Sequence, residues 1–234
     1  ADQALVTAWR RDADLLLTER ERRRADGGLR VALPGHLSVS ALVTLARDPA
    51  ELARQVRRPM PRPPAPYARR GTAFHLWLEE RYGQQRLIDA DDLFGADDAT
   101  EADTDAALTD LRERFEASVW GGRWPRDVEV PFETLIGDRL IRGRIDAVFD
   151  DAGDGVFDVV DWKTGQPPGS PAERHAVAVQ LAAYRLAWAA LAGVPVDRVR
   201  AAFHYVRADL TVRPADLLDE AGLAALIEAV PAEE

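Results

Sequence analysis

The sequence predicts an α/β fold whose elements follow the order α-β-β-β-α-β, with helices flanking a mixed central sheet. Three observations lead to this prediction. Apolar residues recur with a helical period over residues 104–119 and then alternate with charged residues from Val128 onward. Tight turns rich in Gly and Asp separate three consecutive alternating segments, which is typical of an antiparallel meander. A long segment rich in Ala and Leu, residues 171–192, then precedes another strand-like segment at residues 199–207.

The N-terminal region is predicted to be helical. Residues 1–25 place apolar side chains in a mostly charged segment and stop at an Asp-Gly-Gly sequence, which commonly ends a helix. We interpret residues 1–30 as a linker helix that follows an upstream part of a longer polypeptide. Residues 31–234 are long enough to form one domain with its own core.

Two short helices and a proline-rich arm are expected next. Ser38 and Ser40 are candidates for capping the first helix, and Pro49 is expected to open the second. Residues 57–70 contain five prolines and five arginines, which predict an extended segment without helix. This arm is either a stiff connector or a path for DNA. A helix is predicted over residues 71–82.

The three-stranded meander occupies the middle of the chain. Acidic residues 89–103 predict a loop, which leads into the helix at residues 104–119. Gly137-Asp138 and a stretch rich in Gly and Asp at residues 151–155 predict the two turns. The strands are expected at residues 128–133, 139–150 and 156–163.

The C-terminal part is predicted to be helix, strand and helix. The helix at residues 171–192 is followed by Gly193 and Pro195, which end helices. The strand at residues 199–207 comes next, and Pro214 is expected to open the last helix.

Composition excludes several classes of protein. The chain has 234 residues, with 30 Lys and Arg against 40 Asp and Glu, and a formal net charge of −10. Such a chain attracts nucleic acid poorly, so DNA would need local arginines or a partner. The lack of cysteine excludes disulfides, thiolate zinc sites, cysteine nucleophiles and cysteine-ligated iron–sulfur clusters. No apolar run approaches the roughly 18 residues of a membrane span, and no signal-peptide pattern is visible. We therefore expect a soluble, cytoplasmic protein with no membrane partner.

Common catalytic motifs are also missing. A phosphate-binding P-loop needs a Gly-Lys pair, but the single lysine, Lys163, follows Trp162. None of the four serines lies in a Gly-x-Ser-x-Gly motif, and the four histidines form no His-Glu-x-x-His motif. What remains as a source of chemistry is a set of carboxylates around Lys163.

Lys163 is unusual because the other 29 basic residues are arginines. Asp161 and Lys163 are two residues apart at the end of a buried-type strand, so their side chains leave the same face. Asp146 precedes Asp161 by fifteen residues, and a hairpin turning at residues 151–155 would place the two side by side. Facing carboxylates repel each other unless a cation lies between them, and Mg²⁺ or Mn²⁺ suits oxygen ligands. The alternative is that Asp161 and Lys163 form only a surface ion pair.

Two helices offer further polar side chains. His75 follows Phe74 early in the helix at residues 71–82, where it is either a core residue or a metal ligand. Glu79 is one helical turn further on and can orient His75. Gln180 and Tyr184 share one face of the helix at residues 171–192 in the same way.

These residues resemble the signature of the RecB-type nucleases of the PD-(D/E)XK superfamily. The resemblance extends from residue 38 to about residue 210, and the expected element order is similar to the restriction-endonuclease-like core of that superfamily. The segments RRGTAFHLWLE, RGRIDAVFD and VVDWKTG look most like the C-terminal nuclease domains of the B subunits of actinobacterial AdnAB-type helicase–nucleases. The matching motifs, in order, are Gly71-Thr72 with His75, Gly143-Arg144-Ile145-Asp146, Asp161-Trp162-Lys163-Thr164-Gly165, and Gln180 with Tyr184.

The resemblance implies a role for each matching residue. His75, Asp146, Asp161 and the backbone carbonyl of Trp162 would bind Mg²⁺ or Mn²⁺, and Lys163 would be catalytic together with the two aspartates. The remaining residues, Glu79, Gln180, Tyr184, Arg142 and Arg144, are expected to support the site or contact DNA. Many relatives bind an iron–sulfur cluster through cysteines, one of which precedes a proline. Here that place reads Asp48-Pro49, and no cluster is expected.

The implied function is a metal-dependent deoxyribonuclease domain of an ATP-dependent helicase–nuclease that processes double-strand breaks in repair and recombination. Helicase domains upstream on the same polypeptide would deliver single strands of DNA, and a partner helicase–nuclease subunit would complete the assembly. One alternative is a degenerate nuclease fold that serves as a DNA-binding or subunit-docking module. Another is a stand-alone CRISPR-type nuclease, which the missing cysteines disfavour.

Overall fold

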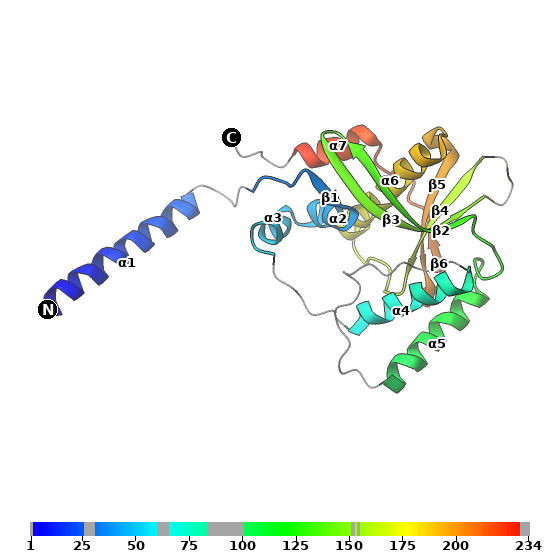
Figure 1. The fold of residues 1–234 in the computed structure, drawn as a ribbon, viewed down its shortest axis with the longest axis horizontal. Coiled ribbons are helices and arrows are strands. Elements are labelled where there is room, and N and C mark those ends of the chain that lie inside the picture. Colours follow the sequence, from blue (N-terminus) through cyan, green and yellow to red (C-terminus); the bar gives the residue numbers. More distant parts are fainter. Residues whose placement is uncertain are drawn as a thin grey trace.

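The computed structural model describes residues 2–25, 31–59, 66–83, 101–150, 153 and 155–229. The predicted α/β class is confirmed: helices flank a mixed six-stranded sheet (Figure 1). The strands are β1 (His36–Ser38), β2 (Asp127–Ile136), β3 (Arg139–Phe149), β4 (Phe157–Lys163), β5 (Val199–Tyr205) and β6 (Leu210–Val212). The helices are α1 (Asp2–Ala25), α2 (Val39–Arg47), α3 (Pro49–Arg57), α4 (Pro66–Arg81), α5 (Glu101–Ala117), α6 (Pro171–Ala192) and α7 (Glu220–Glu228), with short 3₁₀ turns on either side of β5.

Strand β3 is the centre of the sheet, and its two edges are used differently. β2 pairs antiparallel with it over nearly its whole length. The other edge is shared, because β1 pairs in parallel with Leu140–Arg142 and β4 pairs antiparallel with Ala147–Phe149. Residues 143–146 of β3 therefore lie where β1 and β4 separate, and this separation is called the fork below. β5 continues the sheet beside β4 in parallel, and β6 closes it antiparallel.

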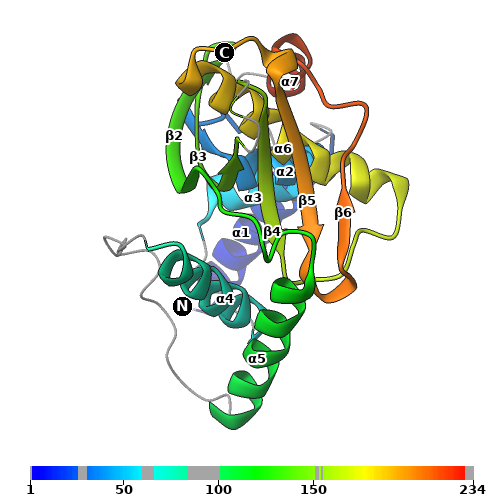
Figure 2. The same ribbon diagram turned by 90° about the vertical axis from the view of Figure 1, so that its right-hand side faces the viewer.

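Alternate residues of the sheet contribute to two separate apolar clusters. Val159 faces a cluster formed with α2, α6 and α7, whereas its neighbour Val160 faces an aromatic-rich cluster formed with α4 and α5. This period of two is the normal consequence of strand geometry. Figure 2 shows α6 and α2 behind the strands and α4 with α5 at one end. The fork is thus enclosed by α4 on one side and α6 on the other.

Several helices begin where the sequence predicts. Ser38, rather than Ser40, caps α2 by accepting a 3.1 Å bond from the N–H of Ala41. α3 begins at Pro49, after Asp48 as its cap. α6 starts with a capping box of Ser170 and Glu173, which satisfies two free N–H groups of the first turn.

Two predicted helix boundaries were wrong. α4 begins at Pro66, within the proline-rich segment that we expected to contain no helix. Proline is tolerated in the first turn because its missing N–H has no helical partner there. The last helix begins at Glu220 after the cap Asp219, not at Pro214, since the Asp219 side chain accepts from the N–H of Gly222. The short strands β1 and β6 were not foreseen.

Some predictions fall outside the described residues. These are the Asp-Gly-Gly end of the first helix, residues 60–65 of the proline-rich arm, and residues 89–100 of the acidic segment. The last three residues of that segment, which we expected in a loop, belong to α5. α1 is a helix as predicted, and Figure 1 shows it extending away from the sheet. Its interpretation as a linker stays a prediction. Among the residues that the structure describes, no helix combines the length and apolarity needed to cross a membrane.

Candidate active site

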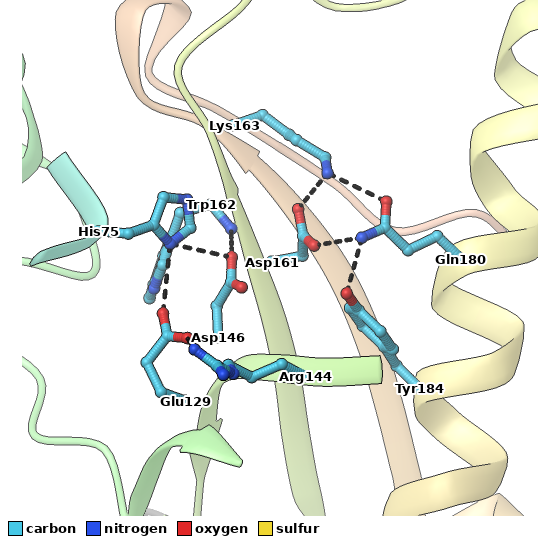
Figure 3. Close-up of polar contacts among 9 residues, drawn as sticks. All are labelled: His75, Glu129, Arg144, Asp146, Asp161, Trp162, Lys163, Gln180 and Tyr184. Carbon is cyan, nitrogen blue, oxygen red and sulfur yellow. Dashed lines mark hydrogen bonds and ion pairs between the residues drawn. The ribbon is translucent and has the colours of Figure 1, made fainter. Parts of the chain in front are cut away.

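Three ligand-type side chains meet at the fork, one from each of three elements. His75 comes from α4, Glu129 from β2 and Asp146 from β3, and one donor atom of each lies within 4.8 Å of the others (Figure 3). The Nδ1 atom of His75 is 3.4 Å from a Glu129 oxygen and 3.7 Å from Oδ2 of Asp146. These are the donor atoms that a divalent cation would need from a protein.

The packing of α4 fixes the position of His75. Phe74, Leu78 and Tyr82 recur at intervals of four residues, so they share one face of the helix. All three are buried in the aromatic-rich cluster against α5 and the sheet. The following residue, His75, is directed towards the fork (Figure 3). The predicted proximity of His75 and Asp146 is therefore present.

Glu129 is a site residue that the sequence reasoning missed. Its backbone φ is +48°, a left-handed conformation that is uncommon for a residue with a side chain and tends to occur at functional sites. The sequence did contain a signal for Glu129. Because Gly137 and Asp138 form the turn between the two strands, counting back equally along each strand places residue 129 opposite residue 146. The alternation of Asp127, Glu129 and Glu133 with apolar residues was used only as evidence for a strand.

A second group of side chains lies on the α6 side of the fork. The ammonium group of Lys163 is 2.7 Å from Oδ2 of Asp161 and donates a 3.0 Å bond to the side-chain oxygen of Gln180. The amide nitrogen of Gln180 in turn donates to Oδ1 of Asp161 at 2.7 Å and to the Tyr184 hydroxyl at 2.8 Å. Gln180 thus holds the Asp161 and Lys163 side chains in fixed positions (Figure 3).

Asp161 is almost completely buried, with 2 % of its surface exposed. The pair with Lys163 is therefore not the exposed strand-end ion pair that was the alternative interpretation. The Asp161 carboxylate is directed towards Lys163 and Gln180, whereas the three-donor group of the structure contains Glu129 in its place. A direct metal–Asp161 bond stays a prediction.

A backbone bond joins the two groups. The N–H of Trp162 donates to Oδ2 of Asp146 at 2.7 Å. The regular β3–β4 ladder ends at the pair Ala147 and Val160, so Asp146 and Asp161 are the next residues on each strand. This is the neighbouring position that the hairpin spacing predicted. The role of the Trp162 carbonyl as a ligand stays a prediction.

The electrostatics at the fork favour positive charge. Burial disfavours the imidazolium form of His75, but Asp146 and Glu129 outweigh this effect and raise its pKa to about 9. Burial, and then the nearby charge of Asp161, raise the pKa of Asp146 to about 7. The Lys163 pKa is also raised, since the attraction of Asp161 exceeds the cost of burial. Without a metal, the raised pKa values of Asp146 and His75 favour protonation of these two groups, which reduces the negative charge at the fork.

The donor set therefore fits a hard divalent cation. Two carboxylates converge with an imidazole nitrogen, and protonation of His75 supplies positive charge between them. A bound Mg²⁺ or Mn²⁺ would replace that proton, because metal ligation requires deprotonated ligands.

The remaining predicted residues lie around this centre. Arg144 is 3.7 Å from the second oxygen of Glu129, so it borders the metal-ligand group. Arg142 forms an exposed 2.8 Å ion pair with Glu133 and is further out. Glu79 is buried on α4 with 5 % exposure, but the carboxylate found against the His75 ring nitrogen is that of Glu129.

Comparisons with known proteins give one clear result. The family model described as the PD-(D/E)XK nuclease superfamily matches residues 36–232. A solved structure titled "Crystal structure of SSO0001" is similar at 19 % identity, covering 93 % of this chain and 84 % of that chain, with a TM-score of 0.43. No curated protein matches the chain. On the strength of the family match across the whole sheet and the fork, the chain belongs to the PD-(D/E)XK nuclease superfamily.

Proposed function

We propose that the chain is a deoxyribonuclease that uses Mg²⁺ or Mn²⁺ to hydrolyse phosphodiester bonds at the fork. The observation that carries this proposal is the convergence of His75, Glu129 and Asp146 within 4.8 Å, beside the ion pair of Lys163 and Asp161. A membership in a nuclease superfamily gives the reaction class. The donor atoms support a hard divalent cation as the cofactor.

The metal would be held by His75, Glu129 and Asp146, with Asp161 and the Trp162 carbonyl as the further ligands that the resemblance implies. When bound, it would polarise the phosphoryl group and acidify a water molecule. The protein supplies rigidity: Asp146 is fixed by the Trp162 N–H, and Glu129 is fixed by its place in β2.

Lys163 is the residue that we assign to charge stabilisation. Its ammonium group is held by Asp161 and Gln180 at the edge of the metal-ligand group. From there it can hydrogen-bond to the attacking water or to a phosphoryl oxygen that gains negative charge. Tyr184 and Gln180 act through these side chains, because both belong to the same hydrogen-bonded network.

A finer proposal follows from the resemblance of the motif sequences. The chain would be the nuclease domain of an ATP-dependent helicase–nuclease that processes double-strand breaks. Upstream helicase domains on the same polypeptide would deliver single strands, and a partner helicase–nuclease subunit would act with it. The net charge of −10 supports this dependence on delivery, because such a chain has little general attraction for DNA.

The rival proposal is a degenerate module that binds DNA or docks a subunit without cutting, and the acidic charge favours the subunit-docking form. One experiment separates the two. The chain is titrated with Mn²⁺ by calorimetry and then incubated with labelled single-stranded DNA. We expect one Mn²⁺ binding event and Mn²⁺-dependent cleavage, and Asp146→Asn should weaken the binding at least tenfold and abolish the cleavage. Binding of Mn²⁺ or DNA without any cleavage would favour the rival.

A further inference from the structure

The loop between α5 and β2, residues 118–126, presents an indole ring to solvent. Trp124 is 70 % exposed. It is nevertheless held in place, because its ring centroid is 5.5 Å from that of Tyr82 and the two rings are nearly perpendicular, at 86°. Tyr82 belongs to the buried aromatic-rich cluster. Trp124 is thus an anchored aromatic side chain with most of its surface available to a ligand.

Arginines flank this tryptophan in the loop. The Arg126 side chain is 54 % exposed, although it contacts Asp127 and Asp150 at 3.3 and 3.4 Å. The guanidinium group of Arg123 lies 4.2 Å from the ring centroid of Trp120, within the range of a cation–π contact.

Positive charge is concentrated around Asp158, which Arg123 of this loop contacts. Arg123, Arg200 and Arg213 all approach the buried carboxylate of Asp158, at 3.7, 2.8 and 3.8 Å. Three guanidinium groups around one carboxylate leave a local surplus of positive charge in a chain whose net charge is −10. An anionic polymer is the ligand class that such a surface attracts.

Two segments of the chain limit the distance between Trp124 and the fork. Tyr82, its neighbour, follows His75 by seven residues of helix, which is about 10 Å along the helix axis. Trp124 also precedes Glu129 by five residues, which can span at most about 18 Å. A DNA strand bound at the fork would reach Trp124 within a few nucleotides.

We propose that Trp124 is a stacking platform for an unpaired base of the DNA strand that the fork holds, with the adjacent phosphates attracted by Arg123 and the arginines grouped with it around Asp158. This inference rests on the proposed nuclease function and specifies its substrate as a strand with unstacked bases. Every base has a face that an indole can cover, so stacking favours single strands without selecting a sequence. In a duplex these faces are already stacked on their neighbours.

The test compares base-containing and base-free strands. Dissociation constants are measured in EDTA, so that no strand is cut, for a short oligothymidylate and for an abasic oligonucleotide of the same length and charge. The proteins are the 234-residue wild-type chain, Trp124→Ala, Trp124→Phe and the control Val119→Ala, which alters another side chain of the same loop that is 70 % exposed.

We expect Trp124→Ala to weaken oligothymidylate binding about 5- to 150-fold, equivalent to a stacking free energy of about 1–3 kcal/mol. Trp124→Phe should retain most of the affinity, and Val119→Ala all of it. The abasic strand should bind wild type and Trp124→Ala equally, since it has no base to stack. A duplex should likewise show no difference.

The contrary results are distinct. If wild type binds and cuts DNA but Trp124→Ala binds both strands as wild type does, the stacking inference is overturned and the nuclease proposal stands. Equal weakening for the abasic strand or the duplex would also overturn it. If wild type neither binds DNA nor cuts it with Mn²⁺, the nuclease proposal fails and the inference fails with it.

Discussion

The backbone N–H of Trp162 donates a 2.7 Å hydrogen bond to the carboxylate of Asp146. The bond lies where the ladder between β3 and β4 stops, so a side chain of one strand takes the place that a backbone carbonyl would otherwise occupy. It ties the orientation of a candidate metal ligand to the backbone of the residue before Lys163. The metal-ligand group and the group of Lys163, Asp161 and Gln180 are therefore held in position relative to each other.

Asp146→Asn removes the negative charge of this side chain but keeps its hydrogen bond, because an amide oxygen can still accept from the Trp162 N–H. We expect cleavage to be abolished and Mn²⁺ affinity to fall at least tenfold. In EDTA at pH 8 the thermal midpoint should stay equal or rise, because the native state holds the Asp146 pKa well above its unfolded value. Cleavage assays, calorimetry and thermal melts measure the three quantities.

The matched control for that variant is Asp138→Asn. Asp138 is 72 % exposed in the turn after β2 and forms only a surface pair with Arg139. Its cleavage rate and Mn²⁺ affinity should equal those of wild type. An Asp146→Asn protein that cleaves at the wild-type rate would show that the metal site is elsewhere.

Lys163→Arg keeps the charge but replaces a compact ammonium group with a planar guanidinium group. The ammonium group now fits between Asp161 and Gln180, and the larger group cannot occupy the same point. We expect single-turnover cleavage to slow by about 10²-fold or more, the scale of losing one transition-state donor. Mn²⁺ affinity should change much less. Cleavage at the wild-type rate would refute the catalytic role of Lys163.

The stability of the metal-free protein should fall as pH rises. Asp146 has a pKa of about 7 when folded, above its unfolded value, so its contribution is lost between about pH 4 and 7. His75 has a folded pKa of about 9, so its contribution is present below about pH 6.5 and lost towards pH 9. In both cases the native state binds more protons than the unfolded state.

Denaturant unfolding in EDTA at pH 5, 7 and 9 tests this expectation. The loss of stability with rising pH should be smaller in Asp146→Asn. This variant lacks the titrating carboxyl group of Asp146 and also the main charge that raises the His75 pKa. Saturating Mn²⁺ should oppose the decline, since metal binding favours the deprotonated ligands. Equal pH profiles for wild type and Asp146→Asn would contradict the assignment.

Gly143 is required by packing within the fork. A Cβ atom at this position would lie 2.7 Å from the Phe132 ring and 2.7 Å from a methyl group of Val39. Gly143→Ala should therefore destabilise the protein by about 1–3 kcal/mol, the usual cost of overpacking. Gly35→Ala is the control, because its Cβ would meet no atom within 4 Å. Denaturant midpoints of the two variants give the comparison.

Local patterns in the sequence were enough to predict most of the fold. Alternation and Gly/Asp turns defined β2, β3 and β4, and the register of their hairpins placed Asp146 beside Asp161. Capping residues fixed the start of α2 and of α3. These features depend on neighbours in the chain, so a single sequence contains them.

Most of the features that were missed depend on contacts between distant segments. β1 exists because residues 36–38 pair with residues 140–142, and three residues carry no period of their own. Glu129 joins the site because α4 places His75 against β2, 54 residues away in the chain. The start of α4 at Pro66 was missed for a local reason, because proline is tolerated in the first turn of a helix and a proline-rich segment does not exclude one.

His75 comes from a different segment than the meander, so the complete ligand group forms only when the whole domain has folded. β2, β3 and β4 are consecutive hairpins that can form from local contacts, and they already contain Glu129, Asp146, Asp161 and Lys163. The imidazole arrives only when α4 packs its apolar face on the sheet. A partly folded chain in which α4 has not packed on the sheet therefore has the acidic residues but not the full ligand group.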